Sequence, residues 1–365
     1  MKRIAITGGG GFLGFHLRAA AQEYGIEILQ ISVGEKFDER SAIESIQSAD
    51  AVIHLAGINR GSEEEVESGN ILFAKQLATS IRKANSSLTS IVFANSIQVG
   101  NGTSYGIGKE KASQTLSECA KELGVEYRNL LLPNLYGEFG KPFYNSVVAT
   151  FCYQIANGLV PEVQNDKELK LLHAQDAADY LLGFHDDASM EATCEKITVS
   201  DVKKLLLEYT ELYSKGEFPD LSTDFRRNLF NTYRSYLFPQ NTPVNIVRHA
   251  DQRGSFFEIV RSNGGTGQTS FSTTVPGVTR GDHFHRRKVE RFTVLSGEAV
   301  ISLRKIFDDE VFTYRISGDQ PLSVDMPTFY THKIENVGEE MLYTAFWTND
   351  IFNSENPDTI GESVE

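Results

Sequence analysis

The first fourteen residues restrict the fold of this chain more than any other stretch. An apolar strand, residues 4–7, runs into the glycine-rich turn Gly8–Gly14, and a helix with apolar periodicity follows at once. Gly8 permits a tight turn, Gly11 lets the backbone approach a pyrophosphate, and Gly14 allows close packing of helix on strand. The free N–H groups of the helix N-terminus suit phosphate binding. This order predicts an α/β domain with a dinucleotide site.

Three further apolar runs are separated by helical patterns, at residues 26–32, 51–57 and 90–96. Strands that alternate with helices predict a doubly wound parallel sheet of the Rossmann type. The residues that we expect to contact the cofactor are Gly8, Gly11, Phe12, Leu13, Gly14, Leu55, Ala56, Gly57, Asn59, Asn70, Tyr105 and Lys109.

The end of the second predicted strand bears on the choice of cofactor. Folds that bind NAD usually carry an acidic residue there, which holds the ribose hydroxyls. Ser32 to Gly34 occupy that place here, and Glu35 lies beyond them. The missing carboxylate favours NADPH over NADH, because an acid would repel the 2′-phosphate. Lys36 or Arg40 could contact that phosphate.

Ser96 ends the strand at 90–96, and Tyr105 and Lys109 follow at helical spacing. Residues four apart share one face of a helix, so a lysine ammonium would lie beside the phenol and lower its pKa. The tyrosine could then exchange a proton with a hydroxyl or carbonyl while a hydride moves, and Ser96 could orient the same oxygen. Both residues could instead be surface residues of a helix. Their order after the glycine turn favours catalysis.

These motifs resemble those of the extended short-chain dehydrogenase/reductase family over about residues 1–240: Thr7-Gly8-x-x-Gly11-x-x-Gly14, His54-Leu-Ala-Gly57, Ser96, Tyr105 and Lys109. Family members that dehydrate sugar nucleotides carry an Asp-Glu pair just after the serine or threonine. Ile97-Gln98-Val99 follows Ser96 here, which favours a reductase. The resemblance implies substrate contacts from Asn59, Arg60, Ser96, Asn134 and Asn145, although packing alone could explain Asn145.

Two prolines, Pro239 and Pro243, mark the best domain boundary, which gives domains of residues 1–243 and 244–365. Beyond it, short strands with glycine turns replace the alternation of strands and helices, which predicts an all-β jelly-roll barrel. Strands are expected at 254–260, 268–272, 299–304 and 342–347, and the acidic tail 355–365 is expected to be partly disordered.

Inside this second half, four side chains form a candidate metal site. Residues two apart on a strand point to the same face, so His283 and His285 can face one cavity. Glu290 and His332, on later strands, can reach that cavity. Three imidazoles and one carboxylate can hold a divalent metal, and zinc is the metal that we expect. The histidines could instead be ordinary surface or core residues of a barrel.

Residues 281–297 resemble the first cupin motif, and residues 318–336 resemble the second, with Thr328 where a glycine is usual. Residues 279–283 also resemble the catalytic segment of metal-free 3,5-epimerases, in which the equivalent histidine is a base. His283 is therefore either a metal ligand or a catalytic base. Of these alternatives we favour a zinc site made from His283, Glu290 and His332, with His285 as fourth ligand or base. Tyr330 or Lys288 is the candidate for the opposing acid.

The pairing of the two halves, together with residues 251–256, 276–281 and 356–359, resembles the bifunctional capsular-polysaccharide epimerase/reductases of bacteria. Those enzymes form UDP-2-acetamido-2,6-dideoxy-L-talose. The resemblance implies that the cupin epimerises C3 of UDP-2-acetamido-2,6-dideoxy-L-arabino-4-hexulose and that the first domain reduces C4 with NADPH. It also implies a homodimer. The alternative is a plain 4-keto-sugar reductase with a non-catalytic sugar-binding cupin.

Charge and cysteine content bear on partners and compartment. The formal net charge is -14, which argues against nucleic acid as a partner. The three cysteines have no C-x-x-C spacing, as suits a reducing compartment. Without a signal peptide or an apolar run of about 18 residues, we expect a cytoplasmic chain with no membrane association.

Overall fold

The computed structural model describes residues 2–252, 254–320 and 322–365 and divides the chain into two compact units. The first comprises Met1–Leu135 and Leu169–Lys196, and the second Tyr136–Glu168 and Ile197–Glu365. Packing thus groups part of the chain before residue 243 with the C-terminal unit. The boundary proposed at residues 243 and 244 stays a prediction, because a packing unit can include segments from either side of a sequence boundary.

A five-stranded parallel sheet forms the centre of the first unit, in the order β2-β1-β3-β4-β5. Its strands are β1 (Arg3–Thr7), β2 (Glu27–Ile31), β3 (Ala51–His54), β4 (Ser90–Ser96) and β5 (Glu126–Leu132). The chain leaves β1 for β2 on one side and continues with β3 on the other. The carboxyl ends of β1 and β3 therefore flank the point at which such sheets bind ligands.

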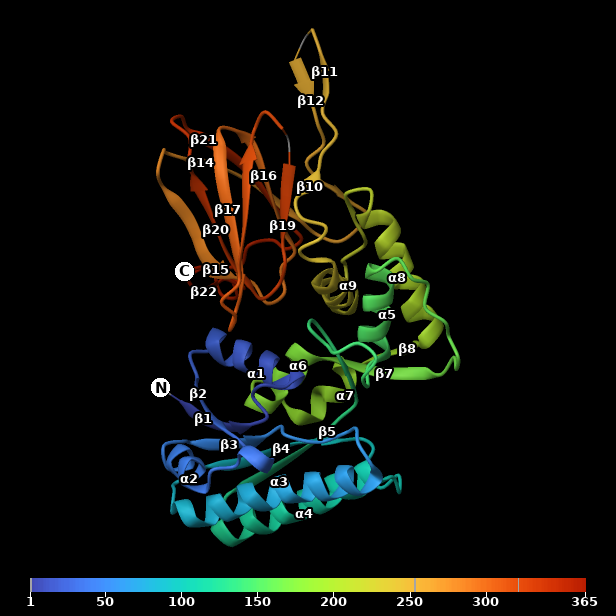
Figure 1. Ribbon diagram of the computed structural model, residues 1–365, viewed down its shortest axis with the longest axis vertical. Coiled ribbons are helices and arrows are strands. Elements are labelled where there is room, and N and C mark those ends of the chain that lie inside the picture. Colours follow the sequence, from blue (N-terminus) through green and yellow to red (C-terminus); the bar gives the residue numbers. More distant parts are fainter. Residues whose placement is uncertain (1, 253, 321) are drawn as a thin grey trace. The chain divides into compact units, whose positions relative to one another are not determined.

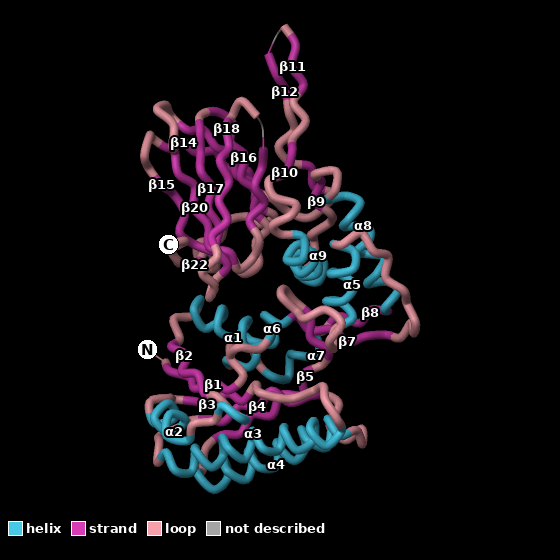
Figure 2. The backbone as a smooth tube through the Cα atoms, viewed as in Figure 1, coloured by secondary structure: helices cyan, strands magenta, loops and turns pink. Residues whose placement is uncertain are grey.

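Helices cover both faces of this sheet (Figures 1 and 2). One face packs on α2 (Glu39–Gln47), α3 (Glu63–Ala84) and α4 (Ser104–Leu123), through a core that includes Ile46, Leu77 and Leu116. The other packs on α1 (Phe12–Glu23) and α6 (Ala174–Leu182), through Leu17 and Leu181. The 3-10 turns η1 (Gly34–Lys36) and η2 (Asp187–Ser189) and the short helix α7 (Met190–Thr193) complete the helical elements described in this unit.

Two five-stranded antiparallel sheets dominate the second unit, in the orders β10-β19-β16-β21-β14 and β18-β17-β20-β15-β22. Buried side chains of both sheets share one core, which includes Val294, Ile301 and Ile334. The strands are β10 (Val244–Asn245), β14 (Gln268–Thr274), β15 (Thr279–Phe284), β16 (Glu290–Ser296), β17 (Glu298–Lys305), β18 (Val311–Ser317), β19 (Leu322–Met326), β20 (Tyr330–Asn336), β21 (Leu342–Thr348) and β22 (Ile360–Gly361).

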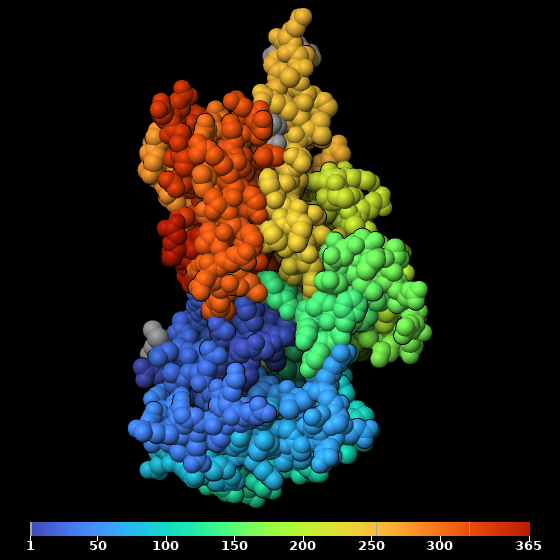
Figure 3. Space-filling model, viewed as in Figure 1, coloured from blue at the N-terminus to red at the C-terminus, as the bar shows by residue number. Residues whose placement is uncertain are grey.

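The second unit also contains the helices α5 (Val147–Ala156), α8 (Val199–Tyr213) and α9 (Asp224–Leu237). A parallel pair joins β9 (Glu217–Phe218) and β13 (Arg261–Ser262). The hairpin of β11 (His249–Asp251) and β12 (Gly254–Phe256) projects from this unit (Figure 3). The division between the units falls within β6 (Asn134–Tyr136), β7 (Glu168–His173) and β8 (Glu195–Thr198), which form a three-stranded sheet.

The predicted fold class, a doubly wound parallel sheet followed by antiparallel β-structure of the cupin type, is confirmed. One predicted strand is too long: the run 254–260 is a strand only to Phe256. Its partner β11 has three residues, so the pairing ends at His249 opposite Phe256. Arg253, within the motif 251–256, lies outside the described residues.

The acidic tail differs most from its prediction, because it is folded onto the barrel. β22 pairs with β15, placing Gly361 opposite His283. Asp358, Ile360 and Val364 are buried. Among all the residues that the structure describes, no helix has the length and apolar character that crossing a membrane requires.

Close packing of helix on strand at Gly14 gives a first prediction. A Cβ on Gly14 would lie 2.3 Å from the Gly8 carbonyl oxygen, whereas a Cβ on Gly10 would meet nothing within 4 Å. The clash is with backbone, which cannot move aside, so Gly14→Ala should destabilise the chain by about 1–3 kcal/mol. Chemical denaturation of the two variants measures this. Equal midpoints for Gly14→Ala and the control Gly10→Ala would contradict the packing described.

Two candidate active sites

The glycine turn of the first unit lies where β1 and β3 end. Gly8 has a φ of +73°, and a Cβ on it would lie 2.7 Å from the backbone nitrogen of Ala56. Only glycine allows this approach without strain. Gly11 precedes α1 as its N-cap and offers no side-chain cap, which leaves the first turn of α1 open to an anion. The predicted residues Gly8 to Gly14, Leu55 and Ala56 are thus brought together.

Thr7 joins the two strand ends, a role that the sequence alone did not suggest. Its Oγ1 accepts hydrogen bonds from the N–H groups of Leu55 and Ala56, each at 3.2 Å. The hydroxyl therefore has its own proton to donate to Nδ1 of His54, 2.7 Å away. Burial, reinforced by the charge of Lys109, lowers the pKa of His54 to about 3. His54 is consequently neutral and can accept this bond.

Ser96 and Tyr105 meet at the carboxyl end of β4. Ser96 is the last residue of that strand, and its hydroxyl is hydrogen-bonded to the phenol of Tyr105, which lies in the first turn of α4. The N–H of Gln98 donates to the Ser96 Oγ at 3.2 Å. Two polar side chains from separate elements thus converge on one point, as the sequence predicts.

Lys109, four residues after Tyr105 on α4, is only 3% exposed. Its Nζ donates to the Ala94 carbonyl at 2.6 Å and lies 4.2 Å from the centroid of the Phe93 ring. Burial lowers the pKa of Lys109 to about 7. The amino group is thus held in place by backbone and ring, and it is only about half protonated at neutral pH.

The expected effect of Lys109 on Tyr105 is wrong for this structure. The pKa of Tyr105 is raised, because burial disfavours phenolate by more than the hydrogen bond to Ser96 favours it. The tyrosine is therefore protonated at neutral pH. A protonated phenol can donate a proton, which suits reduction of a carbonyl better than oxidation of a hydroxyl.

Asn70 is predicted to contact cofactor, but in this structure its side chain hydrogen-bonds to backbone groups. Its amide donates to the carbonyls of Ile58 and Val66, each at 2.7 Å, and accepts from the Ile58 N–H at 3.3 Å. This fixes the loop that carries Asn59 and Arg60, both exposed. Asn70 is thus placed to hold the loop, and its direct contact with cofactor stays a prediction.

The remaining predicted contacts are more scattered. Asn134 is exposed in the first unit, with its amide donating to the Lys170 carbonyl at 3.3 Å, and Asn145 is exposed in the second unit. Of the two cations proposed for a 2′-phosphate, Arg40 pairs with Glu44 at 3.0 Å. Lys36 belongs to η1, directly after the position at which NAD-binding folds carry an acid. All of these roles stay predictions.

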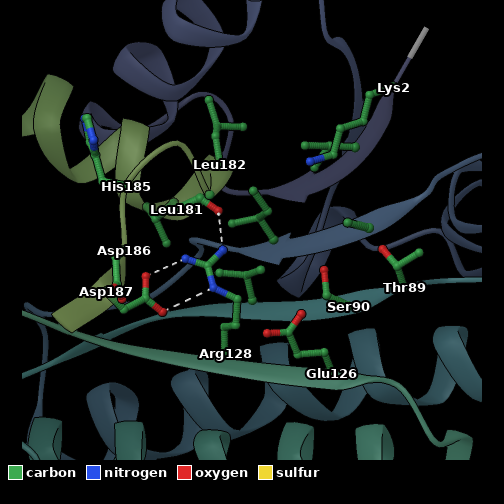
Figure 4. Close-up of a pocket in the computed structure, with 15 residues that line it drawn as sticks. Lys2, Thr89, Ser90, Glu126, Arg128, Leu181, Leu182, His185, Asp186 and Asp187 are labelled. Carbon is green, nitrogen blue, oxygen red and sulfur yellow. Dashed lines mark hydrogen bonds and ion pairs between the residues drawn. The ribbon is translucent and has the colours of Figure 1, made fainter. Parts of the chain in front are cut away.

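A cavity of about 470 Å³ lies at the opposite end of the first sheet from the glycine turn, and none of the predicted site residues line it (Figure 4). It lies at the amino ends of β1, β3, β4 and β5, among residues such as Lys2, Ser90 and Glu126. Arg128 extends across it and donates to the Asp187 carboxylate at 2.5 Å. Ligands of open α/β sheets bind at the carboxyl ends of strands, so this cavity is not where we place a dinucleotide.

The four predicted metal ligands come together in the second unit. His283 lies on β15 opposite His332 on β20, His285 follows β15, and Glu290 begins β16. One ligand atom from each residue lies within 4.8 Å of the others. His285, Glu290 and His332 are at most 9% exposed, whereas His283 is half-buried. Burial, together with the charges of His332 and His285, lowers the pKa of His283 to about 4.

The hydrogen bonds of two histidines show what this cluster requires. Nδ1 of His285 lies 2.5 Å from the Asp358 carbonyl, and Nδ1 of His332 lies 3.1 Å from the Tyr330 carbonyl. In a neutral imidazole that donates from Nδ1, Nε2 presents a lone pair. Both Nε2 atoms face Oε2 of Glu290, at 3.0 and 3.3 Å. Three acceptor atoms that face one another need a cation or a shared proton between them, and this donor set suits zinc.

The two candidates for the opposing acid lie in different surroundings. Tyr330 is two residues before His332 on β20, with its ring 4.7 Å from that of Phe238, and burial raises its pKa. Lys288 is 8% exposed, and its ammonium donates to the Pro357 carbonyl. The role of opposing acid stays a prediction for both residues.

Comparisons with known proteins match both units. The NAD dependent epimerase/dehydratase family matches residues 4–193, and the polysaccharide biosynthesis C-terminal domain matches residues 249–360. The chain is 30% identical to a UDP-2-acetamido-2,6-beta-L-arabino-hexul-4-ose reductase of Pseudomonas aeruginosa, over 99% of each chain. It is 28% identical to the spore coat polysaccharide biosynthesis protein SpsL of Bacillus subtilis, over 31% of this chain and 81% of that protein.

Solved structures also match over nearly the full length of the chain. The capsular polysaccharide assembling protein CapF of Staphylococcus aureus is 32% identical, with a TM-score of 0.63 over 99% of this chain and 100% of that one.

Lys109 should give the chain a stability that depends on pH. Its folded pKa of about 7 lies below the 10.5 of an unburied lysine. Between these values the unfolded chain binds a proton that the folded chain lacks, so the contribution of Lys109 to stability rises with pH. Relative to Lys109→Met, which cannot titrate, the wild-type midpoint of thermal unfolding should therefore rise from about pH 7 to about pH 10. A difference between the two that stays constant across this range would contradict the buried ammonium.

Proposed function

The chain belongs to the NAD-dependent epimerase/dehydratase family, and from that premise we propose that it performs two consecutive reactions on one UDP-linked 4-keto sugar. The cupin epimerises C3 of UDP-2-acetamido-2,6-dideoxy-L-arabino-4-hexulose. The first domain then reduces C4 to give UDP-2-acetamido-2,6-dideoxy-L-talose, a precursor for capsule or O-antigen. One observation carries the proposal: a Ser96–Tyr105–Lys109 set and a His/Glu cluster occur in one chain that aligns end to end with a 4-ulose reductase.

The order of the reactions follows from the chemistry of the ketone. The C4 carbonyl makes the proton on C3 acidic, so that proton can leave and return on the other face without oxidation or reduction. Once C4 is reduced, the acidity is lost. Epimerisation must therefore precede reduction.

In the first domain, Tyr105 is the proton donor. NADPH, when bound at the glycine turn, supplies the hydride for C4. Tyr105 gives its phenolic proton to the C4 oxygen, and Ser96, already hydrogen-bonded to that phenol, orients the same oxygen. The hydrogen bond to Ser96 favours the phenolate left behind, and Lys109 is proposed to bind cofactor from its place on the Ala94 carbonyl.

In the cupin, the four-residue cluster stabilises the negative charge that forms on the C4 oxygen. A zinc ion held there would supply positive charge to the enolate. His285, Glu290 and His332 are the proposed ligands, because their donor atoms already converge. The half-buried His283 is either the fourth ligand or the base that takes the C3 proton. Tyr330 is the proposed acid on the opposite face.

The protein is further proposed to act as a cytoplasmic homodimer that prefers NADPH. These points rest on the resemblance of the sequence to the bifunctional family and on the missing acid after β2. A reductase with a non-catalytic, sugar-binding cupin is the competing function.

Tyr105→Phe should separate the two reactions. It removes the proton donor of the first domain but leaves the cupin unchanged, so NADPH oxidation should fall by about 100-fold or more. Exchange of the C3 proton for deuterium in D2O, followed by NMR on the UDP-4-keto sugar without NADPH, should continue at the wild-type rate. Tyr24→Phe, a change at an exposed ring, is the control. Equal loss of both reactions would contradict separate sites.

Removal of metal should have the opposite effect. Dialysis against a chelator should abolish C3 exchange and release about one equivalent of zinc per chain. NADPH binding, followed by fluorescence, should be unchanged. Full exchange in a chain shown to be metal-free would refute the zinc proposal, and no exchange in the untreated chain would favour the plain reductase.

A further inference from the structure

The C-terminal tail supplies a buried carboxylate directly behind the His/Glu cluster. Asp358 is 4% exposed, and its φ of +44° lies in the left-handed region. Aspartate tolerates this conformation better than most residues other than glycine, yet it is still uncommon. A buried acid in a strained backbone needs compensating contacts, and these contacts are all on the segment that carries the metal ligands.

The Asp358 carboxylate holds the turn between two predicted ligands. Three consecutive backbone N–H groups donate to it, those of Arg286 at 3.0 Å, Arg287 at 2.9 Å and Lys288 at 2.8 Å. Hydrogen bonds to an ionised carboxylate are about twice as strong as neutral ones. The turn follows His285 directly and leads to Glu290. The carboxylate thus fixes the spacing of these two side chains.

The backbone of the same residue sets the orientation of one ligand ring. The Asp358 carbonyl accepts from Nδ1 of His285 at 2.5 Å, which leaves Nε2 directed at Glu290. A carbonyl or carboxylate behind a histidine ligand is what commonly fixes its tautomer and ring orientation in metal sites. Asp358 therefore acts on both His285 and the turn after it.

Anchoring of the tail alone does not account for these contacts, because the tail has other attachments. Asn356 accepts from the Arg287 guanidinium at 3.1 Å, and β22 pairs with β15. The N–H of Val364 donates to the Asp282 carboxylate at 3.1 Å. The tail would therefore stay on the barrel without the Asp358 carboxylate. What would be lost is the fixed shape of the turn.

We propose that Asp358 is a positioning residue of the His/Glu cluster, which makes the C-terminal tail part of the divalent-metal site. This inference rests on the metal site of the proposed function. It concerns how tightly the metal is held, which is measured without substrate.

Asp358→Asn is the informative variant, because asparagine keeps the shape, the backbone carbonyl and the tolerance for positive φ. Its NH2 group would face N–H groups where a carboxylate oxygen now accepts. The affinity of the full-length protein for zinc, measured by competition with a chromophoric chelator, should fall about 10–100-fold. The absorption spectrum of the Co²⁺-loaded protein should change as well. Asn356→Ala, which removes a tail contact without touching a ligand, should leave both unchanged.

Hydrogen exchange of the metal-free chain gives an independent measurement. The amides of residues 286–288 should exchange faster in Asp358→Asn than in wild type. If wild type binds zinc and Asp358→Asn binds it equally well, the inference is overturned while the metal site stands. If wild type binds no zinc, the proposed metal chemistry fails, and exchange at 286–288 then decides whether Asp358 holds the turn. Unchanged exchange there would refute the inference.

Discussion

The close approach of two strand ends sets the geometry of the first unit. Gly8 allows the turn after β1 to come against the backbone of Ala56, and the Thr7 hydroxyl bonds both N–H groups that follow β3. With these ends fixed, the first turn of α1 lies at the carboxyl ends of the strands. Ser96, the last residue of β4, lies at the same end of the sheet. A larger residue at Gly8, or one without a hydroxyl at Thr7, would push the glycine turn away from the end of β3.

Burial sets the protonation state at the first site but is outweighed by neighbouring charges at the second. In the first unit it lowers the pKa of Lys109 to about 7 and raises that of Tyr105, which stays protonated. In the second unit it acts on groups that compensate one another. Glu290 is 9% exposed, yet its pKa is lowered, because the histidines around it outweigh the cost of burial. Such a cluster is stable only with a proton or a metal shared among its members.

The sequence predicts most of what local pattern controls. The glycine spacing gives the first strand and helix. His283 and His285 belong to one cluster, although His285 lies just after β15 and not on it. Prediction from the sequence fails where a property depends on distant partners. The pKa of Tyr105 follows from the depth of its burial, which helical spacing does not reveal. Asp358 looks like part of a disordered acidic tail until the three N–H groups that it accepts, about 70 residues earlier, are known.

We propose that two separate sites in one chain act in turn on one sugar. Mixing two inactive variants, Tyr105→Phe and Glu290→Gln, tests it most directly, with the UDP-4-keto sugar and NADPH supplied and the product sugar identified by NMR. Neither variant alone should form the talose product, whereas the mixture should form it, because the epimerised ketone passes from one variant to the other. If Glu290→Gln alone formed that product at the wild-type rate, or if the mixture formed none, the proposal of two sites acting in turn would be contradicted.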